Sequence, residues 1–307
     1  MEAAGVSNPL TRSGPGHGRR KATNKVMEVV ATVATVIAVA VLAIVIVSVF
    51  IKGVGAINID FLTHVPAPFG QTGGGIADAI VGSLILVAIS SVIAIPIGIL
   101  IAIYTNEFAP PRISSIIRFA LDILNGVPTI VTGIFVFGII VVGHIDIFGI
   151  IKLGGAQSGW AGGIGLAIVM LPIVARSAQE VLLLVPRALH EAALALGLRR
   201  WRIVTRIVVP TAIGGMITGA VLGVARVAGE TAPLLFTSSI FSELGITTNP
   251  SQALPNIPVK IFELSESPAP SDHQAAWAAA LLLILFVLAL NIVARTFHER
   301  SRRRIRA

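Results

Sequence analysis

The sequence predicts an all-α integral membrane protein with six transmembrane helices. Apolar residues make up 55% of the 307 residues and charged residues only 12%, which is about half the charge of a typical soluble domain. Six stretches stay apolar over the roughly 20 residues that a helix needs to cross the hydrocarbon core. Lysine and arginine collect in alternate segments between these stretches, as in an oriented membrane bundle.

The predicted spans cover residues 27–51, 79–104, 119–142, 160–184, 211–231 and 274–293. The first span is too long for the apolar region of a signal peptide and lacks a cleavage site, so we interpret it as a retained helix. Residues 1–26, which include Gly14, Pro15 and Gly16, are predicted to form a disordered cytoplasmic tail. Residues 299–307 are predicted to form a basic cytoplasmic tail.

The positions of the 23 lysines and arginines orient the bundle. They lie in the N-terminal tail, after the second, fourth and sixth spans, or at Lys52, Lys152, Lys260, Arg176 and Arg226. The four basic segments share one side of a six-span topology, and basic residues mark the cytoplasmic side. Both termini are therefore predicted to be cytoplasmic. The net charge of +8 reflects membrane topology rather than nucleic-acid binding, and the basic C-terminal run can contact lipid headgroups.

The remaining composition narrows the possible chemistry. The chain has no cysteine, which excludes disulfides, thiolate metal sites and cysteine nucleophiles, and we expect no metal site or cofactor on it. The opposite segments, 53–78 and 236–273, are rich in glycine, proline and serine. They either fold over the outer mouth, meet a partner or remain solvated.

The segment between the fourth and fifth spans, residues 185–210, is longer than a simple connection requires. Good helix formers run over residues 188–196 and end at Gly197, a residue that can adopt a left-handed conformation after a helix. A second short helix is predicted for residues 199–208, before Pro210 starts the next span. Such amphipathic helices suit docking into a groove on another protein; the alternative is that they lie on lipid headgroups.

The same segment resembles the EAA motif of ABC importer permeases. The matching residues are Glu191, Ala192, Ala193, Gly197, Ile207 and Pro210, with Val209 in place of the usual leucine. The resemblance implies a permease bundle of the type I ABC importer kind over residues 27–298, in which residues 185–210 form the loop that couples to an ATPase. It also implies that Gly197 makes the turn and that Glu191 anchors the loop.

The chain lacks a Gly-x-x-x-x-Gly-Lys-(Ser/Thr) phosphate loop. We therefore predict that it is not an enzyme, and that ATP and Mg²⁺ bind to a partner ATPase. An intramembrane enzyme would need a nucleophile motif or paired aspartates in adjacent spans, and neither pattern is present. A secondary transporter or channel would not need the EAA segment.

Two arginines in predicted spans are candidates for an anion path. A charge inside the bilayer is costly and marks a functional hypothesis, and the planar guanidinium group suits a phosphate oxyanion. Arg226 and Glu230 are spaced to share a helix face, as are Arg176 and Glu180, so each glutamate can hold its arginine or exchange with substrate. The alternatives are structural ion pairs or snorkelling.

Other polar and small residues in the spans are interpreted structurally. Asp122 is expected to cap a helix or to pair with an arginine. Gly215, Gly219 and Gly223 form a stripe that allows close helix packing in lipid.

Three further stretches resemble PstA-type permeases of phosphate-specific ABC importers: residues 73–83, 121–131 and 225–235. Within the last, Thr231-Ala232-Pro233 favours the PstA type over the paired PstC type. The resemblance implies phosphate import across the bacterial inner membrane with a PstC-type permease, a PstB-type ATPase and an external PstS-type binding protein. The alternatives are a permease for molybdate or sulfate, or the PstC-type subunit.

Overall fold

The computed structural model describes residues 17–67, 74–143, 145–147, 151–153, 155–238 and 245–306. These residues are mostly helical, which confirms the predicted all-α membrane class. The described strands form one short hairpin, in which β1 (Ile145–Ile147) pairs antiparallel with β2 (Ile151–Leu153). The chain divides into two compact units, Met1–Ile51 and Lys52–Ala307.

The first unit holds most of helix α1 (His17–Gly53), which is 37 residues long. Its apolar residues recur without a polar face between Val29 and Phe50, as expected for a helix surrounded by lipid. Residues 17–26, assigned from the sequence to a tail, form the first turns of this helix. Residues 1–16 lie outside the described part of the chain.

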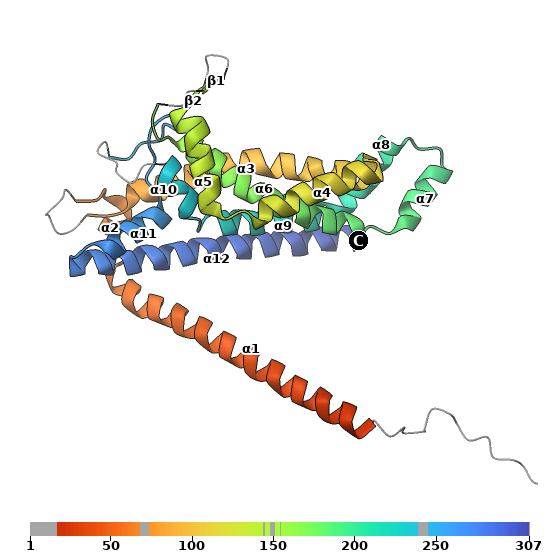
Figure 1. The fold of residues 1–307 in the computed structure, drawn as a ribbon, viewed down its shortest axis with the longest axis horizontal. Helices are drawn as coiled ribbons and strands as arrows, with labels where there is room; N and C mark the ends of the chain where they lie inside the picture. Colours follow the sequence, from red (N-terminus) through yellow and green to blue (C-terminus); the bar gives the residue numbers. More distant parts are fainter. Residues whose placement is uncertain are drawn as a thin grey trace, which may run out of the picture. The chain divides into compact units, whose positions relative to one another are not determined.

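In the second unit the helices α3 (Ala77–Ile103), α6 (Gly159–Leu183), α9 (Val209–Val227) and α12 (Pro270–Arg306) run lengthwise (Figure 1). The shorter helices are η2 (Val54–Ala56), α2 (Ile59–Thr63), α4 (Pro111–Gly126), α5 (Thr129–Val136), α7 (Arg187–Ala195), α8 (Arg200–Ile203), α10 (Ala232–Thr237) and α11 (Ile257–Glu266). Three π-helical segments prolong or join helices, namely η3 (Tyr104–Phe108), η4 (Phe137–Val142) and η5 (Val204–Val208).

Within the described part of the chain, five helical stretches are long and apolar enough to cross a membrane: Arg20–Ala56, Ala77–Phe108, Gly159–Leu183, Arg200–Val227 and Pro270–Ile292. They correspond to the predicted first, second, fourth, fifth and sixth spans. The fifth differs at both ends, because it includes α8 and η5 and stops at Val227 instead of 231. Helix α12 continues to Arg306, so the predicted basic tail prolongs the sixth span as helix.

The predicted third span, 119–142, is not one continuous helix. It begins earlier, with α4 at Pro111, and the chain turns by 97° between α4 and the α5–η4 stretch. The turn lies at Val127-Pro128, where proline lacks a backbone N–H and pushes the preceding residue into an extended conformation. Counted as one broken span, the pair completes the predicted six.

Helix α6 is the centre of the second unit and packs against both α3 and α9. The core between these helices contains Leu86, Leu166, Met170 and Val174, all of them buried. The glycine stripe of α9 faces α6 and allows the close helix packing that the sequence predicted. A Cβ atom on Gly215 would come within 2.5 Å of Val181, and one on Gly219 would overlap Ser177, so only glycine permits this approach.

The two ends of this unit differ in structure (Figure 1). Helices α7 and α8 lie at one end, where α12 also finishes, whereas α2, α10, α11 and the hairpin lie at the other. At that second end, the described part of the segment 236–273 folds back into the bundle. Leu254 is fully buried, and Ile257 N donates to Ser83 Oγ on α3 at 2.8 Å. Within the described residues, this segment is therefore packed rather than simply solvated.

Candidate functional site

The predicted pathway residue Arg176 projects from α6 toward α4. Its guanidinium group forms an ion pair with Asp122 and donates to Arg118 O at 3.0 Å and to Gln179 Oε1 at 3.4 Å. The prediction that Asp122 pairs with an arginine is confirmed. The predicted partner Glu180 is exposed instead, and no ion pair to Arg176 joins it in the described chain. The reason is that α6 turns Arg176 toward a neighbouring helix rather than along its own face.

Further polar residues around this pair were not predicted. Gln179 Nε2 donates to Thr105 Oγ1 at 2.8 Å, and Asn106 Nδ2 donates to Gln179 O at 2.9 Å. Arg118 Nη2 donates to Asn106 Oδ1 at 2.8 Å. These bonds join α4, α6 and the π-helical segment η3. The charge of Arg118 and the position of Gln179, three residues after Arg176, were the only local signals in the sequence.

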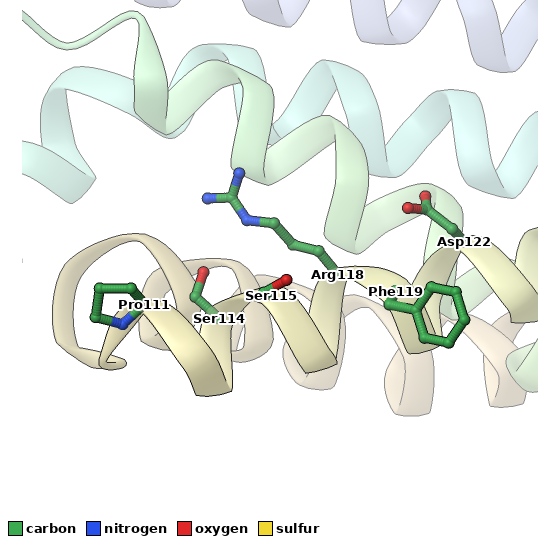
Figure 2. A pocket seen from close by; sticks show the side chains of 6 residues that line it. All are labelled: Pro111, Ser114, Ser115, Arg118, Phe119 and Asp122. Carbon is green, nitrogen blue, oxygen red and sulfur yellow. The ribbon is translucent and has the colours of Figure 1, made fainter.

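Helix α4 also lines a surface pocket of about 460 Å³. Its lining residues are Pro111, Ser114, Ser115, Arg118, Phe119 and Asp122. Figure 2 shows the side chains of Arg118 and Asp122 rising from the same side of α4 toward the neighbouring helix. The pocket therefore borders the Arg176–Asp122 ion pair and mixes both signs of charge.

The second predicted pathway arginine, Arg226, lies in the last turn of α9 and is exposed. The predicted pairing with Glu230 is wrong for this structure, because α9 ends at Val227 and Glu230 lies beyond it. Among the residues that the structure describes, no carboxylate pairs with Arg226. Glu230 is half-buried, and its backbone N–H donates to Val227 O at 3.1 Å. An exposed guanidinium group at this position is available to a solute or to another chain.

The two arginines stand at different levels of the bundle. Helices α6 and α9 are antiparallel, with Gly219 opposite Ser177 and Gly223 opposite both Met170 and Val174. Arg226 lies about one turn beyond Gly223, so it is roughly 10 Å from the level of Arg176 along the helix axis at 1.5 Å per residue. The two arginines therefore do not belong to one common site.

The predicted coupling segment, residues 185–210, forms a turn at Gly197, as the sequence predicted. Helix α7 ends at Ala195, and Gly197 has a φ angle of +75°. Leu198 N donates to Ala193 O at 3.2 Å and Gly197 N donates to Leu194 O at 2.9 Å. This pair of bonds is the Schellman arrangement, which uses a left-handed residue to satisfy the last carbonyls of a helix.

The other residues of the motif divide into a buried and an exposed group. Ala193 is buried in a hydrophobic cluster that also contains Ile203 and Val208, and the partly buried Ile207 packs against that cluster. Glu191 and Ala192 are exposed, and no side-chain hydrogen bond or ion pair of Glu191 is present in the described part of the chain. Pro210 does not begin a separate helix, because α8, η5 and α9 form one continuous stretch.

The widened turn η5 explains how this stretch tolerates Pro210. Proline has no N–H to donate and its ring crowds the preceding turn of an α-helix. A π-helical turn relieves this by inserting one extra residue.

A polar contact also ties α7 to the second span. His190 Nε2 lies 3.2 Å from Glu107 Oε2, and both side chains are largely buried. Arg200 stands over the ring of Phe108, with 5.8 Å between its Cζ atom and the ring centroid. Sequence reasoning missed Glu107 and His190, because no local pattern links residues 83 positions apart.

Comparison with known proteins identifies the family to which this chain belongs. Residues 94–307 match the family described as binding-protein-dependent transport system inner membrane component. This match covers more than half of the chain, and the chain belongs to that family. It is therefore a multi-pass inner-membrane permease of the ABC importer class, which works with an ATPase and a binding protein.

Individual relatives narrow the class further. The chain is 38% identical to the phosphate transport system permease protein PstA of Haemophilus influenzae, over 92% of this chain and 96% of the relative. It is 35% identical to PstA 1 of Mycobacterium tuberculosis, over 77% of this chain and 73% of the relative. The probable PstA of Methanocaldococcus jannaschii is 36% identical over 82% of this chain and 85% of the relative.

Solved structures agree on the fold. A chain of a bacterial alginate ABC transporter, in complex with an alginate-bound periplasmic protein, superposes with a TM-score of 0.62 at 16% identity, covering 92% of this chain and 96% of that one. A chain of the inward-facing MetNI methionine ABC transporter gives a TM-score of 0.54 at 16% identity, over 74% and 94% of the two chains. The predicted type I ABC importer bundle is confirmed.

Proposed function

We propose that this protein is the PstA-type permease subunit of an ABC importer that carries inorganic phosphate across the bacterial inner membrane. The observation that carries the proposal is the 38% identity to a PstA permease over nearly the whole length of both chains. The Thr231-Ala232-Pro233 segment supports the same type. Its helix α10 packs against α5, where a Cβ on Gly133 would come within 2.6 Å of Pro233 Cα.

The two arginines give the proposal a physical basis. Arg226 is exposed and unpaired among the described residues, and a charge in a membrane span needs an aqueous path or a partner. Phosphate would neutralise it through the paired N–H donors of the guanidinium group. Arg176 already has Asp122 as its carboxylate partner. Phosphate would therefore compete with Asp122 for Arg176, and this competition favours release of phosphate over tight binding.

ATP hydrolysis belongs to a separate subunit in this proposal. The chain has no phosphate loop. Helix α7 presents Leu189 and Leu194 to the surface, and Leu196, which directly follows the helix, is 81% exposed. Exposed leucines on a short helix suit a groove on another protein. We assign that groove to a PstB-type ATPase, which would bind ATP and Mg²⁺. A PstC-type permease and a PstS-type external binding protein would complete the importer.

The orientation follows from the charges at the α7 end. Arg187, Arg199, Arg200, Arg202 and Arg206 belong to the segment located there, and α12 finishes at the same end. Basic residues favour the cytoplasm. We therefore place α7 and the C-terminus in the cytoplasm. We place the N-terminus there as well, because basic residues also collect in the first turns of α1.

Uptake in whole cells tests the proposal. A bacterium that lacks its own PstA-type permease should regain high-affinity uptake of radiolabelled phosphate when this chain is expressed with its PstC, PstB and PstS partners. Omitting only this chain should abolish the gain. Uptake of molybdate or sulfate instead of phosphate would favour the alternative, a permease for another oxyanion, and would overturn the proposed substrate.

A further inference from the structure

The π-helical segment η3 contacts three other helices through three consecutive residues. Thr105 Oγ1 accepts from Gln179 Nε2 of α6 at 2.8 Å. Asn106 accepts from Arg118 of α4 at 2.8 Å. Glu107 Oε2 lies 3.2 Å from His190 Nε2 of α7. This short segment is therefore the point at which α4, α6 and α7 meet through polar bonds.

The π-helical geometry accounts for this spread of contacts. Ala109 N donates to Tyr104 O at 2.8 Å, the five-residue step that defines a π-helical turn. Residues two apart point to nearly opposite sides of a helix, and yet Thr105 is 3% and Glu107 is 9% exposed. The segment is thus enclosed on both sides, so it cannot shift without moving α6 or α7.

Hydrogen bonds and the backbone of η3 together link the Arg176–Asp122 ion pair to the contact between Glu107 and His190. At one end Asp122 pairs with Arg176, and Arg176 contacts Gln179, which bonds to Thr105. At the other end Glu107 contacts His190 on α7. Two buried polar atoms at this junction, Arg118 Nε and His190 Nδ1, have no hydrogen-bond partner among the residues that the structure describes.

Unpaired buried atoms are unusual in a purely structural network, because each one costs free energy. Both atoms can therefore gain a partner if the network adopts a second arrangement. Such a two-state element is the physical requirement for coupling between distant positions.

We propose that Thr105, Asn106 and Glu107 are positioning residues that transmit movement between the Arg176–Asp122 ion pair and helix α7. The proposal rests on the proposed function, in which α7 docks onto the ATPase and Arg176 lies on the anion path. In this mechanism η3 moves with α7 during the ATPase cycle. Through Gln179 it then changes the strength of the Arg176–Asp122 pair, and with it the access of phosphate to Arg176.

The first test removes a single bond of the path. Thr105→Val has nearly the same shape but cannot accept the hydrogen bond from Gln179, whereas Thr105→Ser keeps the hydroxyl. Thr218→Val is a matched control, because Thr218 Oγ1 donates only to Gly214 O of its own helix, at 3.0 Å. The assay is phosphate uptake and ATP hydrolysis, measured together on the full importer in proteoliposomes.

The expected result is a change in coupling rather than in assembly. Phosphate taken up per ATP should fall about fivefold in Thr105→Val, within the range that residues on a coupling path produce. It should recover in Thr105→Ser and stay at the wild-type value in Thr218→Val, with similar ATP hydrolysis in all three variants. An unchanged ratio in Thr105→Val, or an equal loss of uptake and hydrolysis, would show that the network is structural and overturn the proposal.

A second measurement does not depend on the substrate. Because the chain has no cysteine, nitroxide labels can be attached at Ser115→Cys on α4 and Ala188→Cys on α7, both exposed positions. The distance between them should stay narrowly distributed in the nucleotide-free and vanadate-trapped importer, and broaden when Thr105→Val is added.

The transport assay and the distance measurement together distinguish a failure of this inference from a failure of the proposed function. Independent movement of the two labels without the Thr105 substitution would refute the inference even if phosphate were transported. Absence of phosphate uptake by the unsubstituted importer would refute the proposed substrate, while the distance measurement would still decide the role of η3.

Discussion

The turn at Gly197 gives the sharpest prediction about the coupling segment. Its φ angle of +75° lies in the left-handed region, and a Cβ atom built on this glycine would meet nothing within 4 Å. Gly197→Ala therefore causes no steric overlap, and its cost is backbone strain alone, about 1 to 2 kcal/mol for an L-residue. Gly197→Asn should cost less, because asparagine tolerates this conformation.

The consequence for α7 can be worked from the same turn. The strain opposes the two hydrogen bonds that end the helix, from Leu198 N to Ala193 O and from Gly197 N to Leu194 O. A penalty of about 1 to 2 kcal/mol lowers the population of the formed turn by about 5- to 30-fold relative to its open forms. Because the exposed Leu196 precedes this turn, docking onto the ATPase should weaken with it.

The assay compares Gly197→Ala, Gly197→Asn and the unsubstituted chain in the purified importer. We expect co-purification of the ATPase and phosphate uptake to fall in the order glycine, asparagine, alanine, with equal amounts of permease in the membrane. Equal activity of the alanine and glycine forms would refute the strain argument. Equal loss in both variants would show that side-chain volume at the interface matters instead of the backbone.

Three further predictions concern the helices of the bundle. Arg226→Gln should reduce phosphate uptake at least about tenfold in whole cells without loss of assembly, because charge-assisted hydrogen bonds are worth about 1.5 to 3 kcal/mol. Gly219→Ala should lower the stability of the purified complex by about 1 to 3 kcal/mol in thermal unfolding, because the added methyl group overlaps α6. Asp122→Asn should lower stability by under about 1 kcal/mol, because the carboxylate is 62% exposed, but should raise phosphate retention at Arg176 in binding assays.

Each of these has a matched control. Arg112→Gln removes an exposed arginine of α4 and should leave uptake intact; loss of uptake in both arginine variants would point to net charge. Gly126→Ala adds a methyl group where nothing lies within 4 Å, so an unfolding shift equal to that of Gly219→Ala would contradict the packing argument. Weaker phosphate retention in Asp122→Asn would contradict competition between Asp122 and the anion.

Much of the bundle was predictable because lipid imposes a simple rule. A span needs a continuous apolar stretch, and basic residues favour one side, so hydropathy located the spans. The glycine stripe of α9 was also predictable, since close helix packing in lipid needs small residues. Gly197 was recognised from the helix formers that precede it.

The broken third span shows where local reasoning stops. Pro128 signalled a weakened helix, but the 97° angle depends on packing against α10, where Gly133 meets Pro233. The π-helical segments were invisible for a related reason. Their residues keep an ordinary helical composition, and the widened turn is recognised only from backbone hydrogen bonds such as that from Ala109 N to Tyr104 O.

The ion pairs were predicted from spacing along one helix, and that assumption failed. Arg176 and Glu180 have the right separation, but α6 is oriented so that Arg176 forms its ion pair with Asp122 on another helix. Arg226 and Glu230 would face each other only if the helix continued, and it ends at Val227. Partners that are distant in sequence require the fold, so the path through Gln179, Thr105 and Glu107 emerged only from the structure.

Uptake of radiolabelled phosphate by the complete importer in proteoliposomes, with an ATPase inside and excess sulfate or molybdate outside, tests the central claim most directly. The proposed function predicts ATP-dependent phosphate accumulation that persists in the presence of both competitors and disappears when this chain is omitted. Accumulation that an excess of either competitor suppresses, or that continues without this chain, would contradict it.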